Sequence, residues 1–219
     1  MTSFLRKRKI KMDRKERDVQ TMAEKMALTA KKLVLVGDAG CGKSCLLATF
    51  MEETFQETYI PTAFDTYKLT IQAKAISTEL LLWDTAGNEQ YDRLRPFSYP
   101  QTDVLLLCFS IGSPETLGTI EEKWMPEVRH FCPRVPVILV GMKKDLRLDK
   151  VITNKLSSLN HVTFERGQAL ATSVGAVSYK ECSALQNDGV RDVFEFAASF
   201  VDDAKLAKKE KTLKCCLPW

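Results

Sequence analysis

The sequence lacks the features of membrane-spanning and secreted proteins. No apolar run approaches the roughly 18 to 20 residues that a transmembrane helix needs. The stretch MTSFLRKRKIKMDRKERD at the start is basic and contains no apolar segment, so we expect no secretory signal there. No internal repeat is visible. A chain of 219 residues suits one domain with tails, because a single core rarely organises more than about 250 residues.

Disulfide and metal-ligand patterns are missing as well. Seven cysteines are present, but they form no CxxC pair or other metal-ligand spacing, and an odd number cannot all pair. Five are scattered and two are adjacent near the end, namely Cys41, Cys45, Cys108, Cys132 and Cys182, then Cys215 and Cys216. We therefore expect free thiols and a reducing compartment, with the terminal pair as the exception.

The net charge of +4 is concentrated at the two ends of the chain. Residues 1–30 carry nine Lys or Arg against four Asp or Glu, and residues 202–219 carry five Lys against three acidic residues. Basic ends on a slightly acidic body favour an anionic partner, a membrane or a nucleic acid, but solvated tails without a partner have the same composition. We expect a flexible basic extension (1–30), one domain (31–201) and a basic tail (202–219).

Between these ends, apolar β runs alternate with helical patterns. The expected strands are 31–36, 66–73, 78–83, 103–109, 135–140 and 176–180, and the expected helices are 44–53, 114–131, 164–174 and 189–206. The second and third strands have no helix between them and fit a hairpin with one antiparallel edge strand. The pattern predicts an α/β fold with a mostly parallel six-stranded sheet, helices on both faces, and a ligand at the carboxyl ends of the strands.

A phosphate-binding pattern follows the first strand. Residues 37–44 read GDAGCGKS, which matches G-x-x-x-x-G-K-[ST] between an expected strand and an expected helix. The backbone N–H groups of such a loop form a cradle for phosphates. Lys43 would neutralise β- and γ-phosphate oxygens, and the Ser44 hydroxyl would bind Mg²⁺.

Further candidates follow later strands. Asp84 comes after the run LLLW, where a carboxylate can organise Mg²⁺, and Gly87 leaves room for a γ-phosphate. Asp145 ends GMKKD and can accept two hydrogen bonds from guanine that adenine does not offer. In the loop ECSAL the Ala184 N–H can reach guanine O6, and Thr62 is the candidate hydroxyl that closes over Mg²⁺ and the γ-phosphate.

These motifs, in this order, resemble the Ras superfamily, and longer strings resemble its Rho family. WDTAGNEQYDRLRPFSYPQTDVLLLCFSI, EKWMPEVRHFCP and VILVGMKKDLR look like Rho-type sequence almost residue for residue. The resemblance spans about residues 31–201. It implies a P-loop NTPase (small G-protein) fold with a Rho-type insert helix at 148–161, and an atypical small GTPase that switches between GTP and GDP with Mg²⁺ as cofactor.

The resemblance also implies partners and site residues. Expected partners are exchange factors, GTPase-activating proteins, effectors that act on the actin cytoskeleton and, after prenylation, a dissociation inhibitor; we expect a monomer and no nucleic-acid polymer. Catalytic roles fall to Lys43, Thr62, Gly87 and Asn88, and metal binding to Ser44 and Thr62, with Asp84 organising the ion indirectly. The nucleotide-binding residues would be Gly37, Asp38, Ala39, Gly40, Cys41, Gly42, Lys43, Ser44, Cys45, Phe55 (packing on the base), Tyr59, Thr62, Asp84, Gly87, Lys143, Asp145, Ser183, Ala184 and Leu185.

Two departures from the Rho pattern lie beside the chemistry. The family usually has Gly at the position of Ala39 and, at that of Asn88, a Gln that orients the attacking water. Asn is one methylene shorter, and about 1.3–1.5 Å of lost reach costs on the order of 10²-fold on proximity arguments. The Ala39 methyl lies where the arginine finger of an activating protein must fit. We expect impaired hydrolysis; neutral drift with intact catalysis is the alternative.

Two more departures lie at the base. Met142 stands where the family has Asn or Thr, and Leu185 where it usually has Lys. Met cannot donate a hydrogen bond to guanine N7, so one or two bonds of about 1 kcal/mol each are lost. Guanine preference should survive through Asp145 and Lys143, with faster nucleotide exchange.

The ending KCCLPW has a C-a-a-X outline, with Cys216 as prenyl acceptor and Cys215 as a palmitoyl candidate. Pro218 and Trp219 match the usual choices poorly, so an unmodified tail remains open. We expect the cytoplasm and the cytoplasmic face of the plasma membrane as location. Two other functions remain open, a pseudo-GTPase that holds GTP without turnover and a P-loop nucleotide kinase. The kinase is disfavoured because no Arg-rich lid is visible.

Overall fold

The computed structural model of the chain describes residues 30–52, 54–55, 64–73, 76–147 and 161–200. The chain divides into two units at Lys31, and the second unit contains the sheet and its helices. Several predicted features lie outside the described residues. They are the basic extension, the insert helix expected before His161, the tail, Tyr59, Thr62 and the two terminal cysteines.

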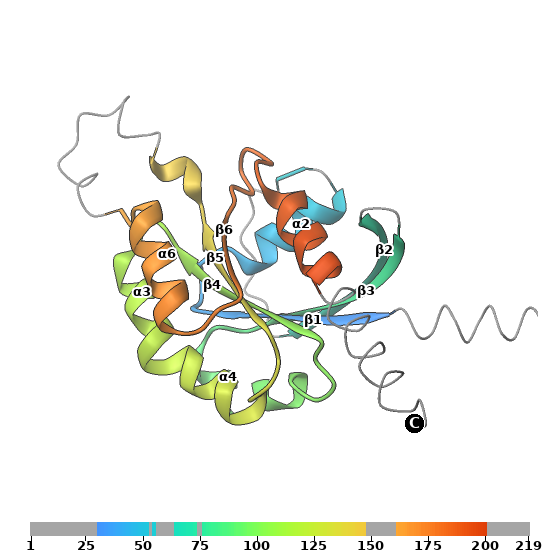
Figure 1. The fold of residues 1–219 in the computed structure, drawn as a ribbon, viewed down its shortest axis with the longest axis horizontal. Coiled ribbons are helices and arrows are strands. Elements are labelled where there is room, and N and C mark those ends of the chain that lie inside the picture. The colour runs from blue at the N-terminus through green and yellow to red at the C-terminus, as the bar shows by residue number, and fades with distance from the viewer. Residues whose placement is uncertain (1–29, 53, 56–63, 74–75, 148–160, 201–219) are drawn as a thin grey trace, which may run out of the picture. The chain divides into compact units, whose positions relative to one another are not determined.

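Six strands form one sheet in the order β2-β3-β1-β4-β5-β6 (Figure 1). β2 and β3 pair antiparallel and all other neighbours pair parallel, which confirms the expected hairpin and its antiparallel edge strand. The strands are β1 (Lys31–Gly37), β2 (Phe64–Ala73), β3 (Ile76–Thr85), β4 (Val104–Ser110), β5 (Val137–Met142) and β6 (Ser178–Glu181). Asp84 and Met142 thus belong to the last residues of β3 and β5, rather than to the loops beyond them.

The helices cover both faces of the sheet, as predicted (Figure 1). α2 (Lys43–Glu52) and the helical residues 190–200 lie on one face. α3 (Pro114–Thr119), a π-helical turn (Ile120–Trp124), α4 (Met125–Phe131) and α6 (Phe164–Ser173) lie on the other. Short 3₁₀ turns are η1 (Glu89–Tyr91), η2 (Arg95–Ser98) and η4 (Lys144–Arg147). No described helix has the length and apolar character to span a bilayer.

Alternate residues of the central strands feed two separate cores. Leu33 and Leu35 of β1 pack with α2 and the helix 190–200, whereas Val34 and Val36 pack with Trp124 and its helix. This is the period-two side-chain alternation of a strand that is covered on both faces. The near-continuous apolar runs in the sequence have this cause.

The helical stretch 114–131 widens into a π-turn just before Pro126. A proline within a helix lacks the N–H for the usual bond and its ring crowds the carbonyl four residues earlier. A π-turn is a known way to accommodate such a break, and it lets the helix continue to Phe131. The expected single helix is therefore present, with an irregularity that its periodicity did not indicate.

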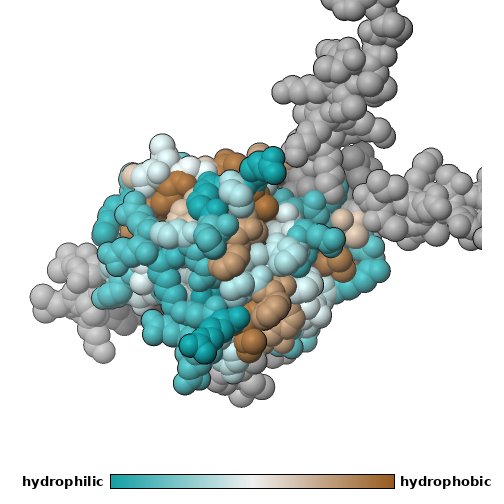
Figure 2. Space-filling view, turned by 90° about the horizontal axis from the view of Figure 1, so that it is seen from below, coloured by the Kyte–Doolittle hydropathy of each residue, from teal (hydrophilic) through white to brown (hydrophobic). Residues whose placement is uncertain are grey.

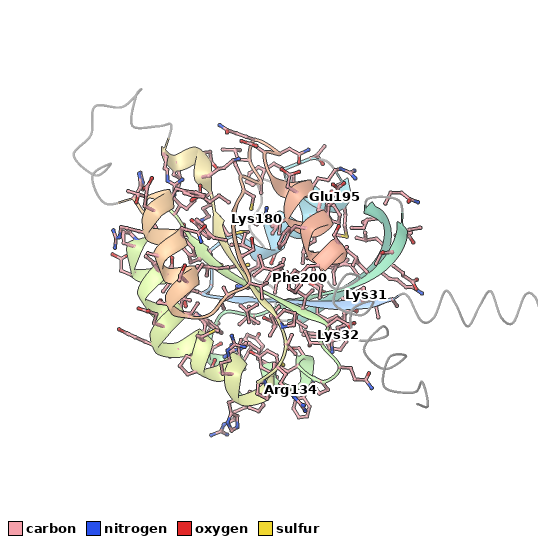
Figure 3. All side chains as sticks on the ribbon, viewed as in Figure 1. Lys31, Lys32, Arg134, Lys180, Glu195 and Phe200 are labelled. Atoms are coloured by element: carbon pink, nitrogen blue, oxygen red, sulfur yellow. The ribbon has the colours of Figure 1, made fainter. Side chains whose placement is uncertain are left out.

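Lysine side chains of the sheet cover aromatic rings. Lys32 lies with Nζ 3.4 Å from the centre of the Trp83 ring and donates to the Pro100 carbonyl at 2.8 Å. Lys180 lies 4.5 Å from the Phe196 ring, beside the helix that carries the labelled Glu195 and Phe200 in Figure 3. These lysines stabilise the fold through cation–π contacts.

A buried arginine anchors the segment that follows β3. Arg95 is 3% exposed, and its guanidinium donates to both carboxylate oxygens of Glu127 at 2.7 Å and to Asp92 at 2.7 Å. Burial alone would lower the pKa of Arg95, but these hydrogen bonds outweigh it and raise the pKa above its usual value. The hydroxyl of Tyr99 also donates to Glu127. The segment is therefore held against α4 by paired charges.

Apolar side chains remain exposed in the same segment. Leu94 is 59% and Phe97 is 75% exposed, on either side of this anchor. Figure 2 shows apolar residues among hydrophilic ones on one face of the molecule. Large contiguous apolar patches mark surfaces that bind partners, whereas single exposed apolar residues are common on any protein.

We predict that Arg95→Leu lowers the free energy of unfolding by about 3 kcal/mol, because it leaves the partly buried Glu127 carboxylate without its cationic partner. The matched control is Arg93→Leu, at an exposed arginine two residues earlier, which should change that free energy by no more than about 0.5 kcal/mol. Chemical denaturation of both variants measures the difference. Equal losses in the two variants would contradict the anchoring role.

Candidate functional site

A cavity of about 660 Å³ opens at the carboxyl ends of β1, β3 and β5. Its described wall comes from the ends of these strands and the segments that follow them, including the start of α2, from the loop after β6 and from Phe55. The wall consists of Ala39, Gly40, Gly42, Lys43, Ser44, Cys45, Phe55, Thr85, Ala86, Gly87, Asn88, Gln90, Tyr91, Met142, Lys143, Asp145, Ala184 and Leu185. A cavity at this edge of a parallel sheet is where α/β proteins bind ligands.

The phosphate-loop residues form a cationic cradle at one end. Lys43 is buried, and its Nζ donates to the carbonyls of Gly37 at 2.7 Å and Asp38 at 2.9 Å. Gly42 has φ +115°, a conformation that side-chain-bearing residues rarely adopt, so only glycine suits this position. An ammonium group surrounded by backbone groups can bind a phosphate oxygen in exchange for these carbonyls.

Gly87 lies directly against the phosphate loop. A Cβ on Gly87 would come within 2.3 Å of the Ala39 nitrogen and of the Gly37 oxygen. The glycine is thus required by the backbone of the loop itself, in addition to the room for a phosphate that its motif predicts. Every substitution there displaces the loop from the segment after β3.

Several predicted nucleotide-binding residues do not line the cavity. Gly37, Cys41, Asp84 and Ser183 are buried and are not among the lining residues, and the Asp38 side chain faces the helix that carries Thr119 and Trp124. The Asp38 carboxylate accepts hydrogen bonds from Thr119 Oγ1 at 2.5 Å and from Trp124 Nε1 at 2.9 Å. Its contacts are those of a residue that holds the loop in place.

Oxygen donors suited to Mg²⁺ lie near the phosphate end. Ser44 lines the cavity, and Asp84 is a carboxylate with 1% exposure at the end of β3, paired in register with Leu35 of β1. Thr85 donates to the Leu35 carbonyl at 2.6 Å and fixes this end of the strand. Hydroxyl and carboxylate oxygens are the ligands that Mg²⁺ prefers, so these residues fit the ion.

The opposite end of the cavity is built around Asp145. Its Oδ1 accepts a hydrogen bond from the buried Ser183 hydroxyl at 2.5 Å, and Ser183 Oγ accepts the Gln186 N–H at 3.1 Å. An antiparallel bridge between Ser183 and Asp188 closes the predicted tight loop. A carboxylate has about four acceptor positions, so Asp145 keeps capacity for a ligand with paired N–H donors.

Lys143 and Met142 connect the two ends. Lys143 Nζ donates to the Gly40 carbonyl at 2.8 Å and ties this loop to the phosphate loop. Met142 is buried, with its methyl 3.6 Å from where a Cβ on Gly42 would lie. Its Sδ accepts the thiol of Cys182 at 3.6 Å, and burial raises the pKa of Cys182 to about 12, so the thiol stays protonated. The thioether therefore fills this space by packing, with no strong hydrogen bond to the phosphate loop.

Asn88 uses its side chain within its own segment. Its Oδ1 accepts the backbone N–H of Gln90 at 3.0 Å and so caps the turn η1. Gln90 and Tyr91 line the cavity but were not among the predicted site residues. An Asn directly before Glu89 is a recognisable N-cap signal, whereas nothing in the sequence alone marked Gln90.

Comparison with known proteins agrees with this geometry. The family model of the Ras family matches residues 32–203. Human Rho-related GTP-binding protein RhoB is 49% identical over 193 residues, covering 87% of this chain and 98% of that protein. The chain belongs to the Rho family of small GTPases. The resemblance noted in the sequence and the predicted P-loop fold are thereby confirmed.

Membership of the Rho family brings several properties in general form. The family binds guanine nucleotide and Mg²⁺ and hydrolyses GTP. Its partners are exchange factors, GTPase-activating proteins and effectors. The protein is thus a Rho-like GTPase switch.

We predict that Met142→Asn slows dissociation of guanine nucleotide by about tenfold, because an amide regains hydrogen bonds worth roughly 1.4 kcal/mol in all. Met142→Leu is the matched control, since it keeps the volume and adds no donor. Release of a fluorescent guanine nucleotide measures both rates. If Leu slows release as much as Asn, packing rather than hydrogen bonding sets the rate.

Proposed function

We propose that this Rho-family protein is a GTP/GDP switch with impaired intrinsic hydrolysis that recruits effectors in signalling to the actin cytoskeleton. One observation carries the proposal. A single cavity has the buried Lys43 ammonium at one end and the Asp145 carboxylate at the other, which are the charges that a nucleoside triphosphate with a guanine base requires.

The residues at the phosphate end would bind and orient the substrate. Lys43 exchanges its carbonyl partners for β- and γ-phosphate oxygens, and backbone N–H groups from residues 39–45 donate to the same phosphates. Ser44 and Thr62 would hold Mg²⁺, with Asp84 orienting the ion. When bound, Mg²⁺ would supply positive charge that offsets the charge developing on the phosphoryl oxygens.

The residues at the other end would select the base. Asp145, held by Ser183, accepts two N–H groups from guanine, and adenine would leave the carboxylate without these donors. Ala184 would donate to guanine O6, and Phe55 and Lys143 would cover the base. Leu185, 57% exposed, can contribute only apolar contact.

Slow hydrolysis is supported by two residues at the phosphate end. Asn88 is shorter than the family's Gln, and its carbonyl oxygen already accepts the Gln90 N–H. Ala39 is an exposed residue of the cavity wall, so its methyl adds volume where an arginine finger must enter. Both features lower the rate without removing the phosphate-binding groups.

The same observation favours a second candidate, a pseudo-GTPase that stays bound to GTP and signals through its abundance or location. It differs from the first only in whether any turnover remains. Single-turnover hydrolysis with and without a Rho-type activating domain separates them, because the pseudo-GTPase shows no turnover in either condition.

Membrane attachment would come from the carboxyl-terminal tail. Five lysines precede Cys215 and Cys216, and each Lys near an anionic leaflet contributes about 1 kcal/mol. A single lipid chain is marginal by itself, so a prenyl group on Cys216 would act together with these lysines or with palmitoyl on Cys215. The protein would then divide between the cytoplasm and the plasma membrane, with a dissociation inhibitor as a further partner.

Exposed Leu94 and Phe97 would contact the protein partners.

We predict selective binding of guanine nucleotide with a requirement for Mg²⁺. Equilibrium binding of labelled GTP and ATP, each with and without Mg²⁺, tests it. Asp145→Asn should reduce the preference for GTP, because the carboxylate acceptor is lost. Comparable affinities of the wild type for GTP and ATP would defeat the proposal.

We predict that Asn88→Gln raises the single-turnover hydrolysis rate and that adding Ala39→Gly raises it further, because reach and space are restored. The measurement is phosphate release from preloaded GTP for the wild type and both variants. A wild-type rate equal to that of RhoB measured alongside would show that hydrolysis is not impaired.

We predict that Cys216→Ser reduces the membrane-bound fraction in cells, because it removes the prenyl acceptor. A deletion of residues 1–30 is the comparison, since that extension is the other basic segment. If the deletion empties the membrane fraction and Cys216→Ser leaves it unchanged, attachment runs through the amino-terminal extension instead.

A further inference from the structure

The segment after β3 carries a second carboxamide at the phosphate end of the cavity. Asn88 and Gln90 both line the cavity, together with Lys43 and Gly87. They are the only carboxamide side chains in the described part of its wall. Since Gly87 touches the phosphate loop, both belong to the end where phosphates bind in the proposed function.

The two carboxamides are not equally available. Oδ1 of Asn88 accepts the Gln90 N–H at 3.0 Å and caps η1. An N-cap of this kind typically contributes about 1 kcal/mol, so turning Asn88 toward a ligand would cost that bond. No hydrogen bond joins the Gln90 carboxamide to another described residue.

Orientation of the attacking water in GTP hydrolysis needs a carboxamide whose oxygen and NH₂ group are both available. A side chain that orients an attacking water accepts a proton of the water through its carbonyl oxygen and donates an N–H to a phosphoryl oxygen. Gln90 is one methylene longer than Asn88. The bond from its backbone N–H to Asn88 fixes the point from which the longer side chain extends.

We propose that Gln90 is the catalytic residue that orients the attacking water, and that Asn88 is a positioning residue that holds the Gln90 backbone. The inference rests on the proposed function, because it concerns GTP hydrolysis at the same site. The water oxygen forms a bond to the γ-phosphorus while the bond from that phosphorus to the β–γ bridging oxygen breaks. The electron pair of the broken bond stays on GDP, and a proton of the water passes to an oxygen of the released phosphate.

The test is single-turnover hydrolysis of GTP by the full-length protein and four variants. Gln90→Met keeps the length of the side chain and removes the carboxamide. Glu89→Met is the matched control, at a neighbouring side chain that is 86% exposed and does not line the cavity. Asn88→Ser keeps an N-cap acceptor without a carboxamide. The double variant Asn88→Gln with Gln90→Met returns a carboxamide from the other position.

We expect Gln90→Met to lower the hydrolysis rate by about tenfold or more with unchanged GTP affinity, and Glu89→Met to leave the rate unchanged. Asn88→Ser should lower the rate by less than Gln90→Met does, and the double variant should recover at least the wild-type rate. Recovery would show that Gln90→Met loses chemistry rather than structure.

Three results would overturn the assignment. They are a Gln90→Met rate within about twofold of the wild type, a larger loss in Asn88→Ser than in Gln90→Met, and no hydrolysis by the wild type at all. GTP affinity distinguishes failure of the Gln90 assignment from failure of the proposed function. If the protein binds GTP selectively but Gln90→Met does not change the hydrolysis rate, only the assignment of Gln90 is wrong. If the protein does not bind GTP selectively, the proposed function is wrong as well.

Discussion

The carboxylate of Asp38 connects parts of the site that come from three separate regions of the chain. It accepts hydrogen bonds from Thr119 at 2.5 Å and from the Trp124 indole at 2.9 Å. The Trp124 ring lies 4.5 Å from the Arg95 guanidinium, which donates to the Ala86 carbonyl at 3.1 Å. A continuous path of buried contacts thus runs from the phosphate loop through one helix to the residue before Gly87. Hydrogen bonds to charged groups are stronger than those between neutral groups. This path therefore fixes both the phosphate loop and the segment after β3 at the phosphate end of the cavity.

The end of the cavity at Asp145 is held by weaker contacts. Lys143 reaches Gly40 through an exposed hydrogen bond, and Met142 touches the phosphate loop only by packing. A solvated lysine bond contributes little, and a thioether contact has no directional preference. We therefore infer that the segment with Met142 and Lys143 separates from the phosphate loop more readily than the segment after β3 does. If the protein binds nucleotide as proposed, we expect release to begin at the base.

The sheet and its helices could be predicted because apolar periodicity reports burial directly. The cavity could be predicted too, since GDAGCGKS and Asp145 stand at strand ends that a parallel sheet brings to one edge. What the sequence could not predict depends on distant contacts. No feature of the sequence indicates that the Asp38 carboxylate accepts a hydrogen bond from Trp124, 86 residues further along. The π-turn before Pro126 has a local cause, the proline within the helix, but periodicity does not show how the chain accommodates that break.

In the proposed function, the departures from the Rho pattern act in one direction. In a switch, the fraction bound to GTP rises when hydrolysis slows and also when GDP leaves faster into a pool richer in GTP. Asn88 and Ala39 bear on hydrolysis, and Met142 and Leu185 on release, while Lys43, Ser44 and Asp145 keep the groups that binding needs. If only hydrolysis were slow, the protein would still need an exchange factor to replace its GDP by GTP. Weak retention at the base would remove much of that dependence. Under the proposed function, the two changes together would make the amount and location of the protein, more than catalysed exchange, the variables that set its output.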